Sequence, residues 1–365
     1  MNHLPMKSPH SILLASLLYV LLASCSSQQP PTPIEPVAPE KDKSKPEAAT
    51  TQEPEVLLPP NPGIAGRPLV KDFIDDLVEK HGFNRQSLVR AFDEAGTIPK
   101  ILDAMAKPYE AKPWYAYRKL FLTEKRIGGG QRFMDDNTEA LRRAKSRYGV
   151  PKEMITAIIG IESAYGVKPG KYRVIDSLST LAFDYPRRAA FFRSELEQFF
   201  LLCREEGEDV LNPLGSYAGA MGMPQFMPSS FRKLAADGDG DGRRDIWKNP
   251  SDAIASVANY FDKNGWESGA PIAVPARVQG SAFQGIVSTK SPKATHTLKE
   301  LEALGVTPKE PVSGALKAGL LELQGEDGPE YWITFHNFTV IMRYNHSPLY
   351  AMAANELIRI WTGPR

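Results

Sequence analysis

The segment PKEMITAIIGIES, residues 151–163, decides the fold. Three of its isoleucines and Glu162 recur at the spacing i, i+3, i+4 and i+7, which places them on one face of an α-helix. Proline is favoured in a first helical turn and glycine ends helices, so we expect this helix to open at Pro151 and to stop by Gly166. The sequence thus predicts a core helix with one carboxylate on its apolar face.

Glu162 is a candidate catalytic acid because of where that pattern places it. A carboxylate on an apolar face is costly unless it is paired or protonated. Desolvation raises the pKa of a carboxyl group, and a general acid that works near neutral pH needs a raised pKa. Two other interpretations stay open: a buried glutamate paired with an arginine, or a helix end that emerges into water.

Other stretches with helical spacing surround this segment, so the chain is predicted to be mainly α. They are residues 73–78, 88–92, 189–203, 254–261 and 355–361. Between about residues 270 and 329 the pattern changes: apolar residues alternate with a short period, and glycine and proline interrupt them. This part is predicted to be a small β-rich insertion.

Composition excludes several functional classes. The 365 residues are 42% hydrophobic and 24% charged, which is typical of a globular protein. Lys and Arg number 44 and Asp and Glu number 43, and no basic stripe is present, so a nucleic-acid partner is not expected. Two cysteines cannot form a disulfide framework or a cysteine-rich zinc site. We expect no organic cofactor.

The N-terminus has the features of a lipoprotein signal peptide. An apolar run over residues 12–23 follows Lys7 and is too short to span a bilayer. The sequence Leu-Ala-Ser-Cys that ends at Cys25 resembles the bacterial lipobox, which implies lipidation of Cys25. The residue that follows the cysteine is Ser26 rather than aspartate, which in Gram-negative lipoproteins implies sorting to the outer membrane. An ordinary secretory signal with a chance cysteine is the alternative.

The residues after Cys25 are predicted to form a tether. Ten of the 31 prolines lie between Pro30 and Pro62, among polar and charged residues. Such a stretch buries too little apolar surface to fold and favours extended conformations. A lipid at one end of a long spacer suggests a catalytic or binding body that is held near the cell wall.

A glycine-rich segment, GSYAGAMGMPQFMPSS at residues 215–230, is a candidate sugar-binding site. Its small residues let a ligand or another helix approach the backbone. Ser216 and Gln225 offer neutral hydrogen bonds, and Phe226 offers a flat apolar face. Close helix packing around the glycines is the alternative.

The acidic segment DGDGDGRRD, residues 237–245, fits the opening of an EF-hand loop and predicts a structural Ca²⁺. Position 12 of such a loop would be Lys248, so the last ligand would have to come from farther along the chain. The alternative is a solvated acidic turn. The candidate ligands are Asp237, Asp239, Asp241, the backbone carbonyl of Arg243, and Asp252.

Several motifs together resemble the membrane-bound lytic murein transglycosylase B family. They occur in order at residues 159–163, 185–189, 219–230, 237–245, 257–261 and 343–347. The resemblance covers about residue 65 to the C-terminus. It implies a lysozyme-like helical core with an N-terminal helical region and a small β-rich insertion. It also implies that Glu162 is the catalytic acid. The substrate-binding residues that it implies are Ser216, Gln225, Phe226, Tyr344, Tyr117 and Tyr260.

The resulting domain organisation has six parts. They are a signal peptide (1–24), a tether (25–62), an N-terminal helical region (63–135), a catalytic core with the EF-hand-like loop (136–269), a β-rich insertion (270–330) and a return to the core (331–365).

The family's reaction is cleavage of the β-1,4 bond between MurNAc and GlcNAc in peptidoglycan, with formation of 1,6-anhydro-MurNAc. One strong carboxylate candidate fits this reaction, since glycosidases that use water pair two carboxylates. A muramidase hydrolase on the same fold and a non-catalytic wall-binding scaffold lipoprotein are the alternatives. The expected partners are glycan strands and, through the lipid, the periplasmic face of the outer membrane. The sequence does not identify partners among the proteins that build the wall.

Overall fold

The computed structural model describes residues 56–106, 112–312 and 315–363. The predicted signal peptide, the lipidation residue Cys25 and most of the predicted tether lie outside these residues. Among the helices that the structure describes, none is both long enough and apolar enough to cross a membrane.

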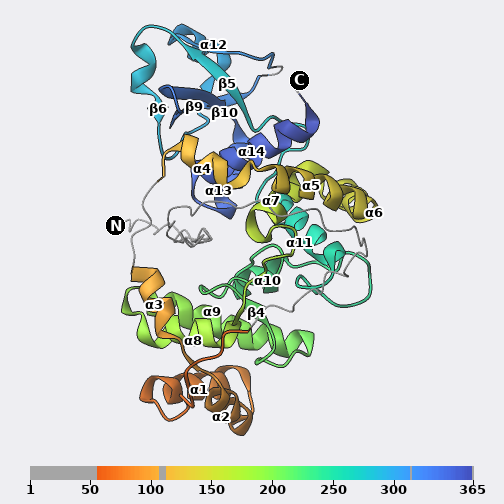
Figure 1. Cartoon of the computed structure of the whole chain (residues 1–365), viewed down its shortest axis with the longest axis vertical. Helices are drawn as coiled ribbons and strands as arrows, with labels where there is room; N and C mark the ends of the chain where they lie inside the picture. Colours follow the sequence, from red (N-terminus) through yellow and green to blue (C-terminus); the bar gives the residue numbers. More distant parts are fainter. Residues whose placement is uncertain (1–55, 107–111, 313–314, 364–365) are drawn as a thin grey trace, which may run out of the picture.

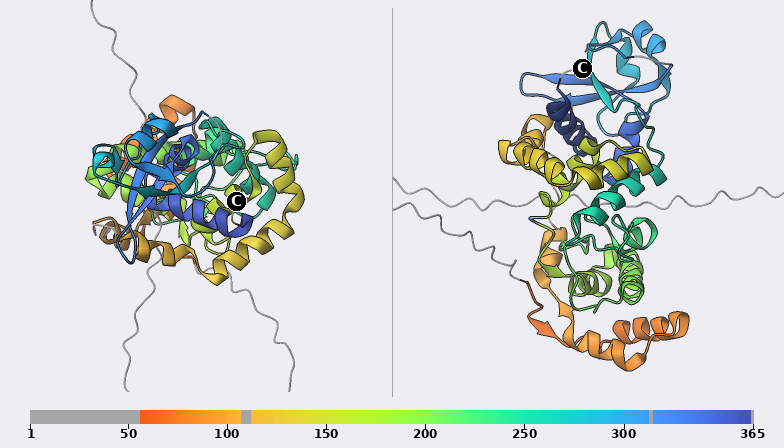
Figure 2. Two further views of the ribbon diagram at one scale, coloured as in Figure 1. Left: turned by 90° about the horizontal axis from the view of Figure 1, so that it is seen from above. Right: turned by 90° about the vertical axis from the view of Figure 1, so that its right-hand side faces the viewer.

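The described chain is elongated, with helices at one end and a β-sheet at the other (Figures 1 and 2). Helices α1 (Pro68–His81) and α2 (Arg85–Glu94) form the first end, and the catalytic candidate Glu162 comes from α7 (Lys152–Ser163), near the middle. The other helices are α3 (Pro99–Ala106), α4 (Trp114–Phe121), α5 (Glu124–Asp136), α6 (Thr138–Tyr148), α8 (Val174–Asp184), α9 (Ala189–Glu206), α10 (Pro228–Leu234), α11 (Pro250–Lys263), α12 (Leu298–Ala303), α13 (His336–Tyr344) and α14 (Pro348–Thr362).

The stretches predicted to be helical lie inside α1, α2, α9, α11 and α14, so these predictions are confirmed. Their ends follow the expected chemistry. Gly82 ends α1 in the left-handed conformation with φ of 65°, which glycine adopts without a steric penalty. Asn84 caps α2 by accepting a hydrogen bond from the backbone N–H of Ser87 at 3.0 Å.

Helix α7 is the centre of the helical core. Every residue from Met154 to Ile161 is buried, because α5, α6, α11 and α14 all contact this helix. The spacing of the isoleucines predicts one buried face, whereas the structure buries all faces. Small residues between the isoleucines, Ala157 and Gly160 among them, allow the surrounding helices to approach.

The predicted insertion contains a six-stranded sheet with the order β6-β9-β10-β5-β8, and β7 pairs with β9. Its strands are β5 (Ala273–Val278), β6 (Val287–Ser288), β7 (His296–Thr297), β8 (Val306–Pro308), β9 (Lys317–Gln324) and β10 (Pro329–Thr334). Strand β10 crosses the boundary predicted at residue 330. It pairs with β9 over its whole length and with β5 over Trp332–Thr334, so it belongs to the sheet.

Successive side chains of a strand point to opposite faces of the sheet, and here both faces are buried. Leu320 and Ile333 face a separate small core that includes Leu301 of α12. Their neighbours Leu321 and Trp332 belong to the main helical core. The sheet is therefore packed against the helices of the catalytic region rather than joined to them by a linker alone.

Two short strand pairs connect distant parts of the helical region. Strand β1 (Asn61–Pro62) pairs with β2 (Gly96–Thr97), and β3 (Tyr172–Arg173) pairs with β4 (Leu214–Gly215). The carboxylate of Asp176, which is fully buried, accepts hydrogen bonds from the backbone N–H of Gly96 at 3.0 Å and from Arg173 Nε at 2.6 Å. This carboxylate ties the N-terminal region to α8.

Replacement of Asp176 by alanine is expected to destabilise the protein by about 3 kcal/mol, because it leaves a buried N–H and a largely buried guanidinium without their acceptor. The midpoint of urea unfolding measures this. Glu139→Ala is the control, since Glu139 pairs with Arg142 on an exposed face of α6. Equal effects of the two substitutions would contradict the role of Asp176.

Candidate active site

Glu162 lies in the last turn of α7 and borders a cavity. The cavity is lined by Glu162, Ala218, Ala220, Gln225, Phe226, Met227, Ser230, Tyr260 and Tyr344. Glu162 Oε1 accepts a hydrogen bond of 2.7 Å from the hydroxyl of Tyr350, which is fully buried in the first turns of α14. One carboxyl oxygen is thus fixed by α14.

Burial raises the pKa of Glu162 to about 7, in the direction predicted from its place among isoleucines. The hydrogen bond from Tyr350 and the positive charge of Arg126 act in the opposite direction, and they are weaker than burial. A carboxyl group with this pKa is substantially protonated near neutral pH, so it can donate a proton there.

The end of α7 lies before Gly166, as predicted, and is conformationally strained. The helix stops at Ser163, before Gly166, because Ala164 and Tyr165 take left-handed conformations with φ of 51° and 63°. The Tyr165 hydroxyl donates to the carbonyl of Arg126 at 2.7 Å. Gly160 is required here, since a Cβ at that position would lie 2.6 Å from the Tyr165 hydroxyl oxygen. Such strain is common next to functional groups.

The glycine-rich segment forms tight turns beside Glu162. Its Ser216 is fully buried, and Ser216 Oγ accepts hydrogen bonds from the backbone N–H groups of Ala218 and Ala220 at 3.2 and 3.0 Å. Gly219 has φ of 81° and packs so closely on α8 that a Cβ would lie 2.4 Å from Leu178. The glycines therefore pack closely, as the alternative interpretation expects, and other residues of the segment line the cavity.

Gln225 lies in the cavity wall in a left-handed conformation with φ of 52°. Its Nε2 donates to the carbonyls of Pro169 and Gly222 at 2.9 and 2.8 Å. These bonds hold the side-chain amide of Gln225 in place. The residue thus connects the glycine-rich segment to the loop that follows α7.

Aromatic rings form part of the cavity wall. Tyr344 stacks on Phe261 and on Tyr350 with interplanar angles of 10° and 9°, and it meets the edge of Tyr260 at 4.6 Å between ring centroids. Phe226 packs against Tyr260 and Tyr344 and is only 3% exposed. The rings support one another, so this wall is rigid.

The hydroxyls of the two tyrosines in this wall bind the backbone. Tyr344 donates to the carbonyl of Pro224 at 2.5 Å, and Tyr260 donates to the carbonyl of Arg343 at 2.8 Å. Burial raises the pKa of both tyrosines, so they remain neutral. What the two residues present to the cavity is therefore mainly ring surface.

The structure brings Glu162, Gln225, Phe226, Tyr260 and Tyr344 together around one cavity. Two predicted site residues, Ser216 and Tyr117, are buried and are not among the residues that line the cavity. Ser216 is covered by its own turn. Tyr117, on α4, is 1% exposed and stacks on Trp114, at a position where its hydroxyl affects the ionisation of Tyr350.

Sequence reasoning missed Tyr350 and Arg126, which act directly on the Glu162 carboxyl. Tyr350 follows the motif at residues 343–347 by only three positions, but its spacing within α14 is that of an ordinary core residue. Arg126 lies on an amphipathic helix where arginine is common on the solvent side. No local pattern marks either residue.

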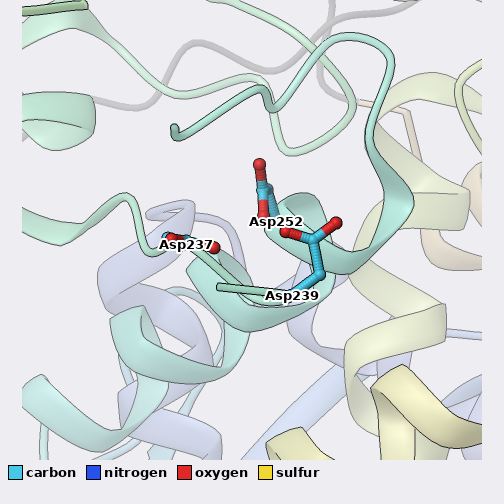
Figure 3. A group of neighbouring side chains, drawn as sticks. All are labelled: Asp237, Asp239 and Asp252. Atoms are coloured by element: carbon cyan, nitrogen blue, oxygen red, sulfur yellow. The ribbon is translucent and has the colours of Figure 1, made fainter. Parts of the chain in front are cut away.

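The acidic loop brings three carboxylates together (Figure 3). One oxygen from each of Asp237, Asp239 and Asp252 lies within 4.8 Å of the others. Asp252 is in the first turn of α11, and its two oxygens accept the backbone N–H groups of Gly238 and Asp245, both at 2.7 Å. These bonds hold the loop against α11.

This cluster has the donor chemistry that Ca²⁺ prefers, since all the gathered atoms are carboxylate oxygens. Burial, together with the charges of Asp239 and Asp237, raises the pKa of Asp252 to about 6, and a bound cation would relieve that repulsion. Asp241 is not part of the gathered group, and its Oδ1 accepts the backbone N–H of Arg243 at 2.8 Å.

Comparison with known proteins gives consistent results. A family model described as "Transglycosylase SLT domain" matches residues 65–358. Membrane-bound lytic murein transglycosylase B of Escherichia coli (strain K12) is 41% identical over 351 residues, which are 93% of this chain and 94% of the relative.

Solved structures agree with this result. Soluble lytic transglycosylase SltB1 from Pseudomonas aeruginosa superposes with a TM-score of 0.77 at 44% identity, over 81% of this chain and 100% of that chain. Escherichia coli lytic transglycosylase Slt35, solved in complex with calcium, gives a TM-score of 0.75 at 42% identity, over 82% of this chain and 94% of that chain. The predicted fold class, a lysozyme-like helical core with an N-terminal helical region and a small β-rich insertion, is confirmed. The chain belongs to the transglycosylase SLT domain family.

Proposed function

We propose that this protein is a lytic transglycosylase that cleaves the β-1,4 bond between MurNAc and GlcNAc in peptidoglycan and leaves 1,6-anhydro-MurNAc ends. One observation carries the proposal. Of the residues that line the cavity in the described part of the chain, Glu162 is the sole carboxyl group, and its pKa is about 7. Hydrolytic glycosidases place two carboxyl groups across the scissile bond.

In the first step protonated Glu162 donates its proton to the glycosidic oxygen. The bond between this oxygen and C1 of MurNAc breaks, and positive charge develops at C1. The oxygen of the sugar's own N-acetyl group stabilises that charge. The hydrogen bond from Tyr350 stabilises the carboxylate that Glu162 becomes.

In the second step the Glu162 carboxylate accepts the proton of the C6 hydroxyl of the same MurNAc. The C6 oxygen then bonds to C1 and closes the 1,6-anhydro ring. The proton that Glu162 gave is thereby replaced, and no water is consumed. Since the nucleophile belongs to the substrate, the step has the advantage of an intramolecular reaction.

The proposed substrate-binding residues are Gln225, Phe226, Tyr260 and Tyr344, which lie around the cavity. Ser216 and Tyr117 are buried, so they are not proposed to touch the sugar; Ser216 holds the turn that carries Ala218 and Ala220 of the cavity lining. Related proteins support a glycan ligand. SltB3 from Pseudomonas aeruginosa, at 32% identity and a TM-score of 0.73, was solved in complex with NAG-anhNAM-pentapeptide. Slt35 was solved in complex with bulgecin A.

We also propose a structural Ca²⁺ ion held by Asp237, Asp239 and Asp252, with Asp241 and the carbonyl of Arg243 as further ligands. The gathered carboxylates and the calcium complex of Slt35 support it. The ion would fix the loop before α11 and supply no step of the reaction.

The proposed location is the periplasmic face of the outer membrane, where lipid on Cys25 would hold the chain. The lipobox-like sequence before Cys25 supports this, as does the membrane-bound relative of Escherichia coli. The tether would let the catalytic body reach glycan strands of the wall.

Glu162→Gln is expected to lower the rate of glycan cleavage by about 10²- to 10⁴-fold, because the amide has no proton to donate. Mass spectrometry of sacculus digests measures the products of the native enzyme, which should be 1,6-anhydro ends. Glu153→Gln, on the same helix but outside the cavity, is the control. Reducing ends heavier by one water would identify a hydrolase, and an unchanged Glu162→Gln variant would identify a non-catalytic role.

The value of kcat/KM is expected to be nearly constant below about pH 7 and to fall about tenfold per pH unit above it, because only protonated Glu162 is a proton donor. The pH profile of sacculus digestion checks this. An enzyme that keeps its full rate two pH units higher would contradict the assignment of Glu162 as the acid.

The same pKa makes stability depend on pH. Because the folded-state pKa of Glu162 lies above its unfolded value of 4.5, its contribution to stability is complete below about pH 4.5 and is lost as pH rises through about 7. Glu162→Gln has no such loss, so its stability relative to the native protein should increase by about 3 kcal/mol across this window. Urea unfolding of both proteins between about pH 4.5 and 7 measures this. A difference in their free energies of unfolding that does not change with pH would argue against the raised pKa of Glu162.

Calcium at about 10 mM is expected to stabilise the protein by about 1.5–3 kcal/mol, if the affinity is that of extracellular modules, and chelator should reverse the effect. Thermal unfolding measures this. Asp252→Asn should lose most of the response, whereas Asp262→Asn, at the exposed far end of α11, should keep it. A melting temperature indifferent to calcium and chelator would rule out the site.

A further inference from the structure

Arg126 is in an unfavourable position for an arginine that serves folding alone. It lies in the first turn of α5, where its backbone N–H is capped by Thr123 Oγ1 at 3.2 Å. A positive charge is unfavourable at the N-terminus of a helix, because of the helix dipole. Burial also lowers the pKa of Arg126, and within the described part of the chain no carboxylate forms an ion pair with it.

Two hydrogen bonds of Arg126 lead to the end of α7. Its Nη1 donates to the carbonyl of Gly160, two residues before Glu162. Its own carbonyl accepts the hydroxyl of Tyr165, three residues after Glu162. The guanidinium lies over the ring of Phe121, with 5.3 Å between its carbon and the ring centroid. The side chain of Arg126 thus binds α7 just before the acid, and its backbone binds the residue that follows the helix.

We propose that Arg126 is a positioning residue for Glu162: it binds the last turn of α7 and holds a positive charge beside the carboxyl, where it stabilises the carboxylate that proton donation leaves behind. This inference rests on the proposed function. A cation also interacts favourably with the C-terminal end of a helix dipole, which is where Gly160 lies in α7. Arginine suits the position because its planar group keeps its charge when partly buried.

The groups that act on the Glu162 carboxyl come from three helices. Tyr350 of α14 donates a hydrogen bond to it, and Tyr344 of α13 interacts with it electrostatically. Arg126 of α5 supplies positive charge, and it lowers the pKa of Glu162 against the larger effect of burial. Tyr165 faces Arg126 in turn. The charge of Arg126 thus counteracts part of the rise in the pKa of Glu162 that burial causes.

The experiment compares the pH profile of kcat/KM for Arg126→Gln, Arg126→Lys and the native enzyme on purified sacculi. Arg126→Gln keeps a hydrogen-bond donor and loses the charge, so the alkaline limb should move to higher pH by about one unit and kcat should fall. Arg126→Lys keeps the charge, so its alkaline limb should stay near the native position. Lys125→Gln removes a charge from the adjacent, exposed position and should change neither quantity.

A folded Arg126→Gln enzyme with the native alkaline limb would overturn the inference. If Arg126→Gln does not fold, Arg126→Met takes its place, since it also loses the charge and keeps an apolar side chain of similar length: a native alkaline limb there would overturn the inference, and a limb moved to higher pH would support it. Glu162→Gln in the same assay separates the two proposals. Activity that survives Glu162→Gln would refute the proposed function, whereas an inactive Glu162→Gln with an unmoved Arg126→Gln limb would refute only the role of Arg126.

Discussion

The enclosure of one carboxyl group within a helical core is the constraint on which the rest of this structure depends. Helix α7 carries Glu162 and is surrounded by four other helices, so no face of it reaches water along most of its length. Burial among these helices raises the pKa of Glu162 to about 7, which makes the group a proton donor near neutral pH. A buried carboxyl group also needs polar partners inside the protein, and Tyr350 supplies a hydrogen bond and Arg126 a positive charge.

The walls of the cavity follow a common principle: polar side chains bind the backbone, and apolar surface faces the ligand space. Ser216, Gln225, Tyr260 and Tyr344 each direct polar atoms to backbone groups of neighbouring turns. These bonds hold loops of unusual conformation in one arrangement. A cavity built in this way is ordered before substrate arrives, which lowers the entropic cost of binding.

Local patterns were sufficient to predict helices α1, α2, α7, α9, α11 and α14, the β-rich insertion and the position of Glu162, because each depends on residues close in sequence. Long-range contacts were not predictable in this way. Tyr350 looks like an ordinary core residue of α14, yet its hydroxyl reaches Glu162 on α7. The left-handed end of α7 depends on Tyr165 reaching α5. In each case a distant partner, rather than the local pattern, determines the outcome.

The contact between Tyr350 and Glu162 joins residues 188 positions apart, and its consequence concerns when the protein gains its activity. Contacts of such separation form late in folding, because the intervening chain must first be ordered. An incompletely folded or truncated chain would contain the acid without the hydroxyl that orients it. A transglycosylase built in this way would therefore become able to cut the wall only after its last helix had docked.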